Sequence, residues 1–253
     1  MPTITIDNCT AHYRMSKRAS PDTPAAVCVH GSGADSVVWG YQVSRLSKQF
    51  RIIAPDLPGH GASEGAALES AEAYARWIDR FALALELDTF FLMGHSFGGA
   101  IVQEYSRLFP EKLKGILLIA TGAGFKLSSS YRELHENGVD VERLNSDAIP
   151  ASIRQGYDML KKVSGPALHA DLLAAGAFNS TAWISAIQVP ALVLWGSADC
   201  ITPRDLPEQL ACMLPNASFH VIEHAGHVLM VEAVDAFNTA VAAFMIKISG
   251  YGK

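Results

Sequence analysis

Short apolar runs alternate along this chain with segments of helical spacing, and this alternation limits the possible folds more than any other feature of the sequence. Six runs are apolar almost without interruption, as is typical of strands that are buried on both faces of a sheet. The segments between them place apolar residues three or four positions apart, as amphipathic helices do. Strand and helix in succession predict a mainly parallel sheet with helices on both faces. We expect strands at residues 25–29, 51–54, 89–93, 113–120, 191–195 and 218–222, and helices at residues 70–87, 97–109, 203–214 and 229–248.

The N-terminus and one internal segment depart from this alternation. Residues 3–7 and 9–15 are expected to form two strands joined tightly at Asn8. Residues 123–187 contain no buried-strand run and several short helical pieces, so we expect a helical insertion between two strands. Because it follows one strand and precedes the next, it should lie at the carboxyl ends of the strands, where such sheets bind ligands. We therefore divide the chain into a core of residues 1–122 and 188–253 and an insertion of residues 123–187.

The composition excludes several classes of protein. Of 253 residues, 49% are hydrophobic and 18% are charged, which is an ordinary globular balance and argues against a disordered, collagenous or coiled-coil chain. The net charge of −5 argues against a nucleic-acid-binding surface. No apolar run approaches the roughly 18 residues that a membrane span needs. The four cysteines form no CxxC pair, and the N-terminus lacks the pattern of a signal peptide. We therefore expect a cytoplasmic protein with no membrane span and no nucleic-acid partner.

The segment Gly94-His95-Ser96-Phe97-Gly98 carries the clearest chemical signal. It has the form G-x-S-x-G, and it lies between an apolar strand and a helix, which is the context that this motif requires. A serine on so sharp a turn adopts a strained backbone, and glycines on either side avoid crowding it. The turn exposes the hydroxyl of Ser96, while the helix directs its free N–H groups to the same point. We expect Ser96 to be a nucleophile and the N–H of Phe97 to stabilise an oxyanion.

A serine nucleophile needs a base and an acid that orients the base. His227 follows the expected strand at 218–222, in a loop at the carboxyl end of that strand, and is the predicted base. His224 is the alternative, but it continues the strand. A metal site of Glu223, His224 and His227 is rejected, because the order is not H-E-x-x-H and Gly226 interrupts any helix that would align them. We expect neither a metal nor a cofactor.

The orienting acid is expected to be Asp199, which lies just beyond the buried strand at 191–195. The alternative role for Asp199 is to cap the segment that begins at Thr202. Residues 120–125, which follow the preceding strand, contain no carboxylate. The position of Asp199 at a strand end therefore favours the orienting role.

A second oxyanion donor should come from the loop His30-Gly31-Ser32-Gly33, which ends another strand. Glycines allow the backbone of such a loop to approach a substrate oxygen closely. We expect the N–H of Ser32 to be this donor and His30 to be a structural residue beneath the loop.

Five motifs together resemble the α/β-hydrolase superfamily, and the resemblance covers the whole chain except the insertion. It implies an eight-stranded sheet, a helical cap inserted after the sixth strand, and a catalytic triad in the chain order Ser96, Asp199, His227. It also implies that Asp56 and His60 are structural parts of a tight turn. The motifs are His30-Gly31-Ser32-Gly33, Asp56-Leu57-Pro58-Gly59-His60-Gly61-Ala62-Ser63, Gly94-His95-Ser96-Phe97-Gly98-Gly99, Gly196-Ser197-Ala198-Asp199 and Gly226-His227.

The resemblance is less specific about the substrate. Serine at position 96 differs from the aspartate of haloalkane dehalogenases and epoxide hydrolases. The loop at residues 30–33 is similar to that of C–C hydrolases acting on meta-ring-fission products, which usually carry Pro-Gly next, asparagine before the nucleophile and tryptophan after the catalytic histidine. This chain has Ala34-Asp35, His95 and Val228 there.

We therefore expect a hydrolase of small carboxylic esters, and the alternatives are a C–C hydrolase and a receptor-like member with little turnover. The insertion should form part of the substrate pocket, because it has more apolar residues than thin surface helices need for their own packing. The residues expected to line the pocket are Gly31, Phe125, Ile153, Tyr157, Leu160, Phe178 and Val228.

Overall fold

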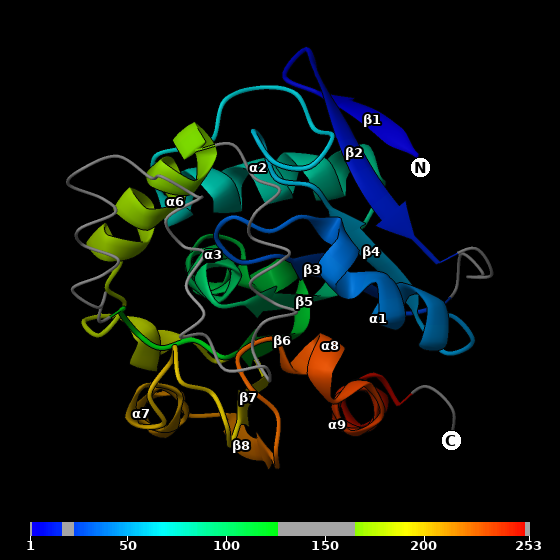
Figure 1. Ribbon diagram of the computed structural model, residues 1–253. Helices are drawn as coiled ribbons and strands as arrows, with labels where there is room; N and C mark the ends of the chain where they lie inside the picture. Colours follow the sequence, from blue (N-terminus) through cyan, green and yellow to red (C-terminus); the bar gives the residue numbers. More distant parts are fainter. Residues whose placement is uncertain (1, 17–22, 126–164, 251–253) are drawn as a thin grey trace.

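The computed structural model describes residues 2–16, 23–125 and 165–250, and its centre is a sheet of eight strands (Figure 1). The strands lie in the order β1-β2-β4-β3-β5-β6-β7-β8. Strand β2 runs antiparallel to β1 and to β4, and all the other neighbouring strands are parallel. The predicted eight-stranded, mainly parallel sheet is therefore confirmed. The strands are β1 Thr3–Ile6, β2 Cys9–Met15, β3 Ala25–Val29, β4 Arg51–Pro55, β5 Phe90–His95, β6 Leu113–Ile119, β7 Ala191–Gly196 and β8 Ala217–Ile222.

The four predicted helices are present, but one of them is divided, and several short helices were not predicted. The apolar pattern of residues 229–248 predicts one helix, but the structure divides it into α8 and α9 at Ala233, whose φ of −128° and ψ of 54° are not helical. Helix α1 and the short 3₁₀ helices were not predicted. The helices are α1 Gly40–Arg45, α2 Ala71–Ala84, α3 Phe97–Leu108, α6 Gly165–Ala177, α7 Asp205–Met213, α8 Leu229–Glu232 and α9 Val234–Ser249, and the 3₁₀ helices are η1 Ser36–Trp39, η2 Pro110–Lys112 and η3 Ile184–Ala186.

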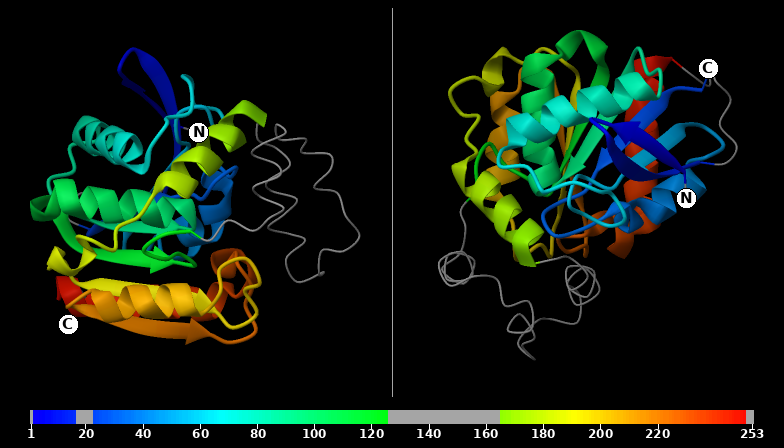
Figure 2. Two further views of the ribbon diagram at one scale, coloured as in Figure 1. Left: turned by 90° about the vertical axis from the view of Figure 1, so that its left-hand side faces the viewer. Right: turned by 90° about the horizontal axis from the view of Figure 1, so that it is seen from above.

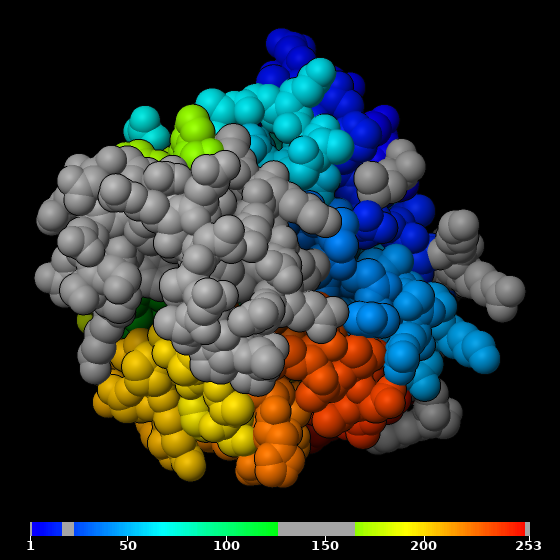
Figure 3. All heavy atoms as spheres, viewed as in Figure 1, coloured from blue at the N-terminus to red at the C-terminus, as the bar shows by residue number. Residues whose placement is uncertain are grey.

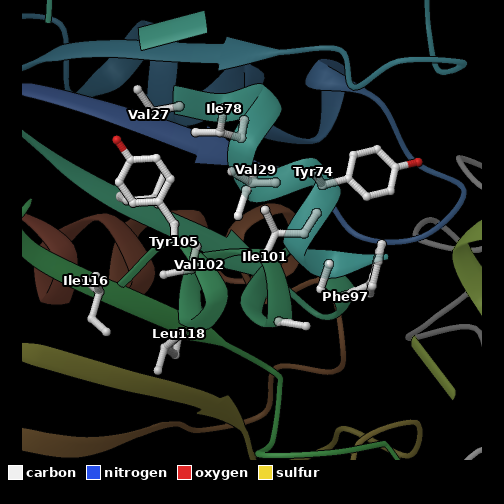
Figure 4. Close-up of a cluster of buried hydrophobic side chains, with 14 of the residues drawn as sticks. Val27, Val29, Tyr74, Ile78, Phe97, Ile101, Val102, Tyr105, Ile116 and Leu118 are labelled. Atoms are coloured by element: carbon white, nitrogen blue, oxygen red, sulfur yellow. The ribbon is translucent and has the colours of Figure 1, made fainter. Parts of the chain in front are cut away.

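Two apolar clusters cover the two faces of the sheet, because successive residues of a strand point to opposite sides. On β5, Phe90 and Leu92 join the cluster formed with α2 and α3, whereas Phe91 and Met93 join the cluster formed with α1, α8 and α9. The N-terminal hairpin and the β8 end with α7 lie at opposite ends of the molecule (Figure 3). Figure 4 shows part of the first cluster, with Ile78 and Tyr74 of α2, Ile101, Val102 and Tyr105 of α3, and Val27, Val29, Ile116 and Leu118 of the strands.

The two ends of the insertion lie side by side at the carboxyl end of β6. Gly124 pairs with Asn179 in an isolated antiparallel bridge, and the N–H of Ser180 donates to the carbonyl of Ala123 at 2.7 Å. The arrows of β6 (green) and β8 (orange) point in the same direction in the left view of Figure 2, so the carboxyl ends of these two strands lie on the same side of the molecule. Residues 126–164 lie outside the described residues, so the division at 123–187 remains a prediction. Within the described ranges, no helix combines the length and the apolar character that crossing a membrane requires.

Candidate active site

The turn between β5 and α3 holds Ser96 in a strained backbone conformation, with φ of 52° and ψ of −119°. The N–H of Ser96 donates to the carbonyl of Ile119 on β6 at 2.8 Å, so the turn is fixed to the neighbouring strand. A Cβ at Gly94 would lie 2.2 Å from the carbonyl oxygen of Gly98, and one at Gly98 would lie 2.5 Å from that of Val29. Only glycine fits at both positions, as the sequence motif predicts.

The structure places His227 and Asp199 within hydrogen-bond distance of each other. Nδ1 of His227 lies 3.0 Å from Oδ2 of Asp199, and the Asp199 side chain is fully buried. An ionised carboxylate only accepts, so Nδ1 carries the proton and Nε2 is left as an acceptor. The other oxygen of Asp199 accepts from the N–H of Ile201 at 2.8 Å and of Thr202 at 2.9 Å. One carboxylate therefore both caps its own turn and contacts His227.

The alternative base, His224, is exposed at a turn with φ of 63°. Its N–H donates to the hydroxyl of Ser197 at 2.8 Å. It is His227, and not His224, that contacts the carboxylate of Asp199. The geometry therefore favours the base that the sequence analysis selected.

Glu232, in the first turn after the His227 loop, contacts that loop on both sides of the histidine. Its carboxylate accepts from the N–H of Gly226 at 2.6 Å and from the N–H of Val228 at 3.0 Å. Glu232 was not predicted from the sequence to be a site residue. The sequence feature that could have identified Glu232 is its position in the first turn of a helix, where acidic residues commonly accept hydrogen bonds from free N–H groups.

His95 also supports the backbone at His227. Nε2 of His95 lies 2.9 Å from the carbonyl oxygen of His227, and the two ring centroids are 4.7 Å apart. Since a carbonyl only accepts, Nε2 of His95 carries the proton. Burial and the neighbouring His227 hold the pKa of His95 well below its ordinary value, so its ring is neutral. From the sequence, His95 was notable only as a departure from the C–C hydrolase pattern, and this contact was not predicted.

The loop after β3 brings backbone N–H groups next to Ser96. A Cβ at Gly31 would lie 3.1 Å from the Cβ of Ser96, so this loop contacts the turn of Ser96 directly. The two expected donors are the N–H groups of Ser32 and Phe97. Among the described residues neither N–H has a backbone acceptor, and their role towards a substrate remains a prediction.

His30 supports the same loop from beneath, as expected. Its Nδ1–H donates to the carbonyl of Gly31 at 2.9 Å, and its Nε2 accepts from the N–H of Leu57 at 3.1 Å. Burial and the nearby His60 lower the pKa of His30 to about 4. His30 is therefore a neutral structural residue that fixes the Gly31 carbonyl.

The turn that begins at Asp56 is tied together as the resemblance implies. The carboxylate of Asp56 accepts from the N–H of Ser36 at 2.8 Å and from the N–H of Ala62 at 3.0 Å. His60, at the end of this turn, reaches the carboxylate of Asp171 on α6. Asp171 could not be recognised from the sequence, because it lies within the expected insertion and belongs to none of the motifs.

Four of the expected pocket residues lie in the described part of the chain. Gly31 and Val228 adjoin Ser96 and His227 respectively. The rings of Phe125 and Phe178 are 6.1 Å apart, and Phe178 also packs against Trp183 in the first apolar cluster; their role in a pocket remains a prediction. No group of three or more His, Cys, Asp or Glu side chains within the described ranges is placed to hold a metal ion. The other expected pocket residues, Ile153, Tyr157 and Leu160, lie outside the described residues.

Comparisons with known proteins agree with this arrangement. Residues 26–240 match the model of the alpha/beta hydrolase family. The chain is 27% identical to the 2-hydroxymuconate semialdehyde hydrolase of Pseudomonas putida, over 96% of this chain and 95% of the relative. It is 25% identical to the pimeloyl-[acyl-carrier protein] methyl ester esterase of Serratia marcescens, over 87% and 92% of the two chains.

Solved structures show the same fold. The enol-lactonase from Burkholderia xenovorans superposes with a TM-score of 0.85 at 21% identity, covering 96% of this chain and 99% of that one. A thermophilic esterase from Thermogutta terrifontis superposes with a TM-score of 0.82 at 24% identity, covering 97% of both chains.

Proposed function

Since this chain belongs to the alpha/beta hydrolase family, we propose that it is a serine hydrolase that cleaves a small carboxylic ester through an acyl-enzyme intermediate. The observation that carries the proposal is the 3.0 Å contact between Nδ1 of His227 and Oδ2 of Asp199, at the same edge of the sheet as the strained turn of Ser96. Nucleophile, base and orienting acid are the three parts that acyl transfer by a serine requires.

In the proposed reaction, Oγ of Ser96 attacks the ester carbonyl carbon and its proton passes to Nε2 of His227. Asp199 keeps the proton on Nδ1 and stabilises the imidazolium that forms. His227 then gives its proton to the oxygen of the leaving alcohol as the C–O bond breaks. The product of this half-reaction is an acyl group on Ser96. Water, deprotonated by His227, releases the acid and restores the hydroxyl.

The negative charge on the carbonyl oxygen would be stabilised by the N–H groups of Ser32 and Phe97. Both are backbone donors in fixed segments, so they need little reorganisation when the charge develops. Each such donor typically lowers the barrier by about 3–4 kcal/mol. Phe97 is also the first residue of α3, whose dipole favours negative charge at that end.

Hydrolysis of a C–C bond is the second candidate function, and it is favoured by similarity to one of the relatives. The relative from Pseudomonas putida, named for hydrolysis of 2-hydroxymuconate semialdehyde, is similar over nearly the whole chain. Against this, His95 stands before the nucleophile and Val228 follows His227, where such enzymes usually carry asparagine and tryptophan. The ester reaction therefore remains the proposal, with C–C cleavage as its alternative. A receptor-like protein is the other alternative, and it would keep these residues with little turnover.

The test combines labelling with turnover. A fluorophosphonate probe should label the protein, and the Ser96→Ala variant should not be labelled. Turnover is then measured on a panel of p-nitrophenyl esters and on a vinylogous diketone acid of the meta-cleavage type. Ester turnover that exceeds cleavage of the diketone acid supports the proposal. Preferential cleavage of the diketone acid would establish the C–C reaction, and labelling without turnover of either class would indicate the receptor-like alternative.

A further inference from the structure

Asp171, on helix α6 of the insertion, is a buried carboxylate with three hydrogen-bond partners from three different segments of the chain. Its Oδ2 accepts from the N–H of Gly33 at 3.1 Å and from Nε2 of His60 at 2.9 Å. Its Oδ1 accepts from the hydroxyl of Tyr74 at 3.0 Å. The Asp171 side chain is 1% exposed and that of His60 is fully buried. The insertion thus places a charged group inside the core, in contact with the loop of Ser32.

The contacts of His60 show that the pair is ionic. Nδ1 of His60 lies 3.0 Å from the carbonyl oxygen of Pro58, and Nε2 faces the carboxylate of Asp171. Both partners are acceptors, so both ring nitrogens carry protons and the ring is an imidazolium. Burial works to lower the pKa of His60, but the hydrogen bond and charge of Asp171 outweigh it and the net shift is upward. A buried charge that loses its partner is strongly destabilising, so each group holds the other in place.

The contact between Asp171 and Gly33 fixes the loop next to the proposed oxyanion donor. The N–H of Ser32 shares a rigid peptide plane with the carbonyl of Gly31. That carbonyl accepts from the His30 ring at 2.9 Å and from the N–H of Ala34 at 3.2 Å. The next peptide plane ends in the N–H of Gly33, which Asp171 holds. The two consecutive planes that meet at Cα of Ser32 are therefore both fixed, the first, which contains the Ser32 N–H, through the Gly31 carbonyl and the second through Asp171.

We propose that Asp171 is a positioning residue for the reaction, which holds the Ser32 N–H in line with the developing oxyanion by binding the N–H of Gly33. The inference rests on the proposed function, since it requires an oxyanion at Ser32. A donor that is already aimed at the developing charge stabilises the transition state more than the ground state, so its loss lowers kcat and leaves KM nearly unchanged. A carboxylate that only stabilises the fold would lower Tm and leave kcat unchanged.

The test variant is Asp171→Asn, which keeps the shape of the side chain and removes its charge. Asp79→Asn is the matched control, because Asp79 also accepts from a tyrosine hydroxyl, that of Tyr105 at 3.0 Å, and pairs with a cation, Lys112. The control site lies at the amino ends of the strands, since Lys112 directly precedes β6. For each variant we would measure kcat and KM on a p-nitrophenyl ester, the inhibition constant of a trifluoromethyl ketone, and Tm. The ketone adds the serine oxygen and places an oxyanion in the hole.

We expect Asp171→Asn to lower kcat by about 10- to 100-fold, with KM changed by less than about 3-fold. The affinity for the trifluoromethyl ketone should fall by a similar factor, and Asp79→Asn should lower Tm without either kinetic effect. If Asp171→Asn lowers Tm alone and keeps kcat and ketone affinity, the positioning role is overturned.

Two further results complete the test. If Asp171→Asn does not fold, His60→Gln decides, because it removes the cation and leaves the carboxylate. In His60→Gln, a loss of kcat and of ketone affinity that is smaller than the loss expected for Asp171→Asn supports the inference. Unchanged kcat and ketone affinity refute it. Failure of the proposed function is recognised separately, since a Ser96→Ala variant that retains turnover would refute both the proposed function and this role of Asp171.

Discussion

Glu232 holds His227 through the backbone on both sides of it, with 2.6 Å to the N–H of Gly226 and 3.0 Å to the N–H of Val228. The proposed base is thus held at its ring by Asp199 and at its main chain by Glu232 and His95. An amide at position 232 can accept from only one of these N–H groups, and its NH₂ would face the other. This relationship gives the first prediction.

Glu232→Gln should lower kcat on a p-nitrophenyl ester by about 10-fold, because the imidazole loses part of its alignment. It should also lower the free energy of unfolding by about 1–3 kcal/mol, since one backbone N–H is left without an acceptor. Both are measured on the purified variant, by steady-state kinetics and by urea unfolding. Glu223→Gln, in the same loop but exposed, is the control and should change neither quantity. Equal kinetics for the two variants would contradict the role of Glu232.

Because the three residues of the proposed triad act as a unit, the losses of kcat caused by substituting them should not add. Ser96→Ala and His227→Ala should each lower kcat by about 10⁴- to 10⁶-fold, and the double variant should lose no more than either single one. Asp199→Asn should lower kcat by a somewhat smaller factor than Ser96→Ala or His227→Ala does. His224→Ala is the matched control and should be mild, because His224 is exposed and does not contact Asp199. If His224→Ala abolishes activity and His227→Ala does not, the assignment of the base is wrong.

The strands and the turn at Ser96 could be predicted from sequence because their signals are local. Buried runs and the glycines around Ser96 occupy consecutive positions, and the observed strand ends differ from the predicted ones by no more than two residues. The division at Ala233 could not be predicted, because the apolar spacing continues through it.

The residues that support the site leave no such local pattern. Asp171 is 138 positions from Gly33, 111 from His60 and 97 from Tyr74, so no local pattern links it to its partners. His95 likewise meets the backbone of His227 and not its ring nitrogens. Sequence motifs therefore identified Ser96, His227 and Asp199, whereas the supporting roles of Glu232, His95 and Asp171 required the fold.

Acid should destabilise the protein through its neutral buried histidines. Burial and His60 lower the pKa of His30 to about 4. Below its ordinary value of about 6.5, the unfolded chain takes up a proton that the folded chain does not, so stability falls as the pH falls. The effect of His30 alone is about 2 kcal/mol between pH 7 and pH 5. His95 acts in the same direction, because its pKa is also lowered.

His60 acts with the opposite sign, so the test must isolate His30. The raised pKa of His60 means that its contribution is complete below its ordinary value and is lost as the pH rises through the raised one. Urea unfolding of the parent protein and of His30→Asn at pH 7, 6 and 5 separates the contribution of His30 to stability from that of His60. The variant should lose less stability on acidification than the parent does, and His224→Asn should follow the parent. Parallel curves for the parent and His30→Asn would show that His30 is not the titrating group.

The last prediction concerns the turn that carries Ser96. A Cβ at Gly98 would lie 2.5 Å from the carbonyl oxygen of Val29 and 2.6 Å from that of His30, and neither carbonyl is the end of a flexible side chain. Gly98→Ala should therefore force α3 away from β3 and destabilise the fold by about 3 kcal/mol or more. Gly40→Ala is the control, since a Cβ there meets nothing within 4 Å and the residue has helical φ and ψ of −55° and −38°. That substitution should be neutral or stabilise by up to about 1 kcal/mol. Urea unfolding and fluorophosphonate labelling of both variants would check this, and a stable, fully labelled Gly98→Ala protein would refute the close contact between the Ser96 turn and β3.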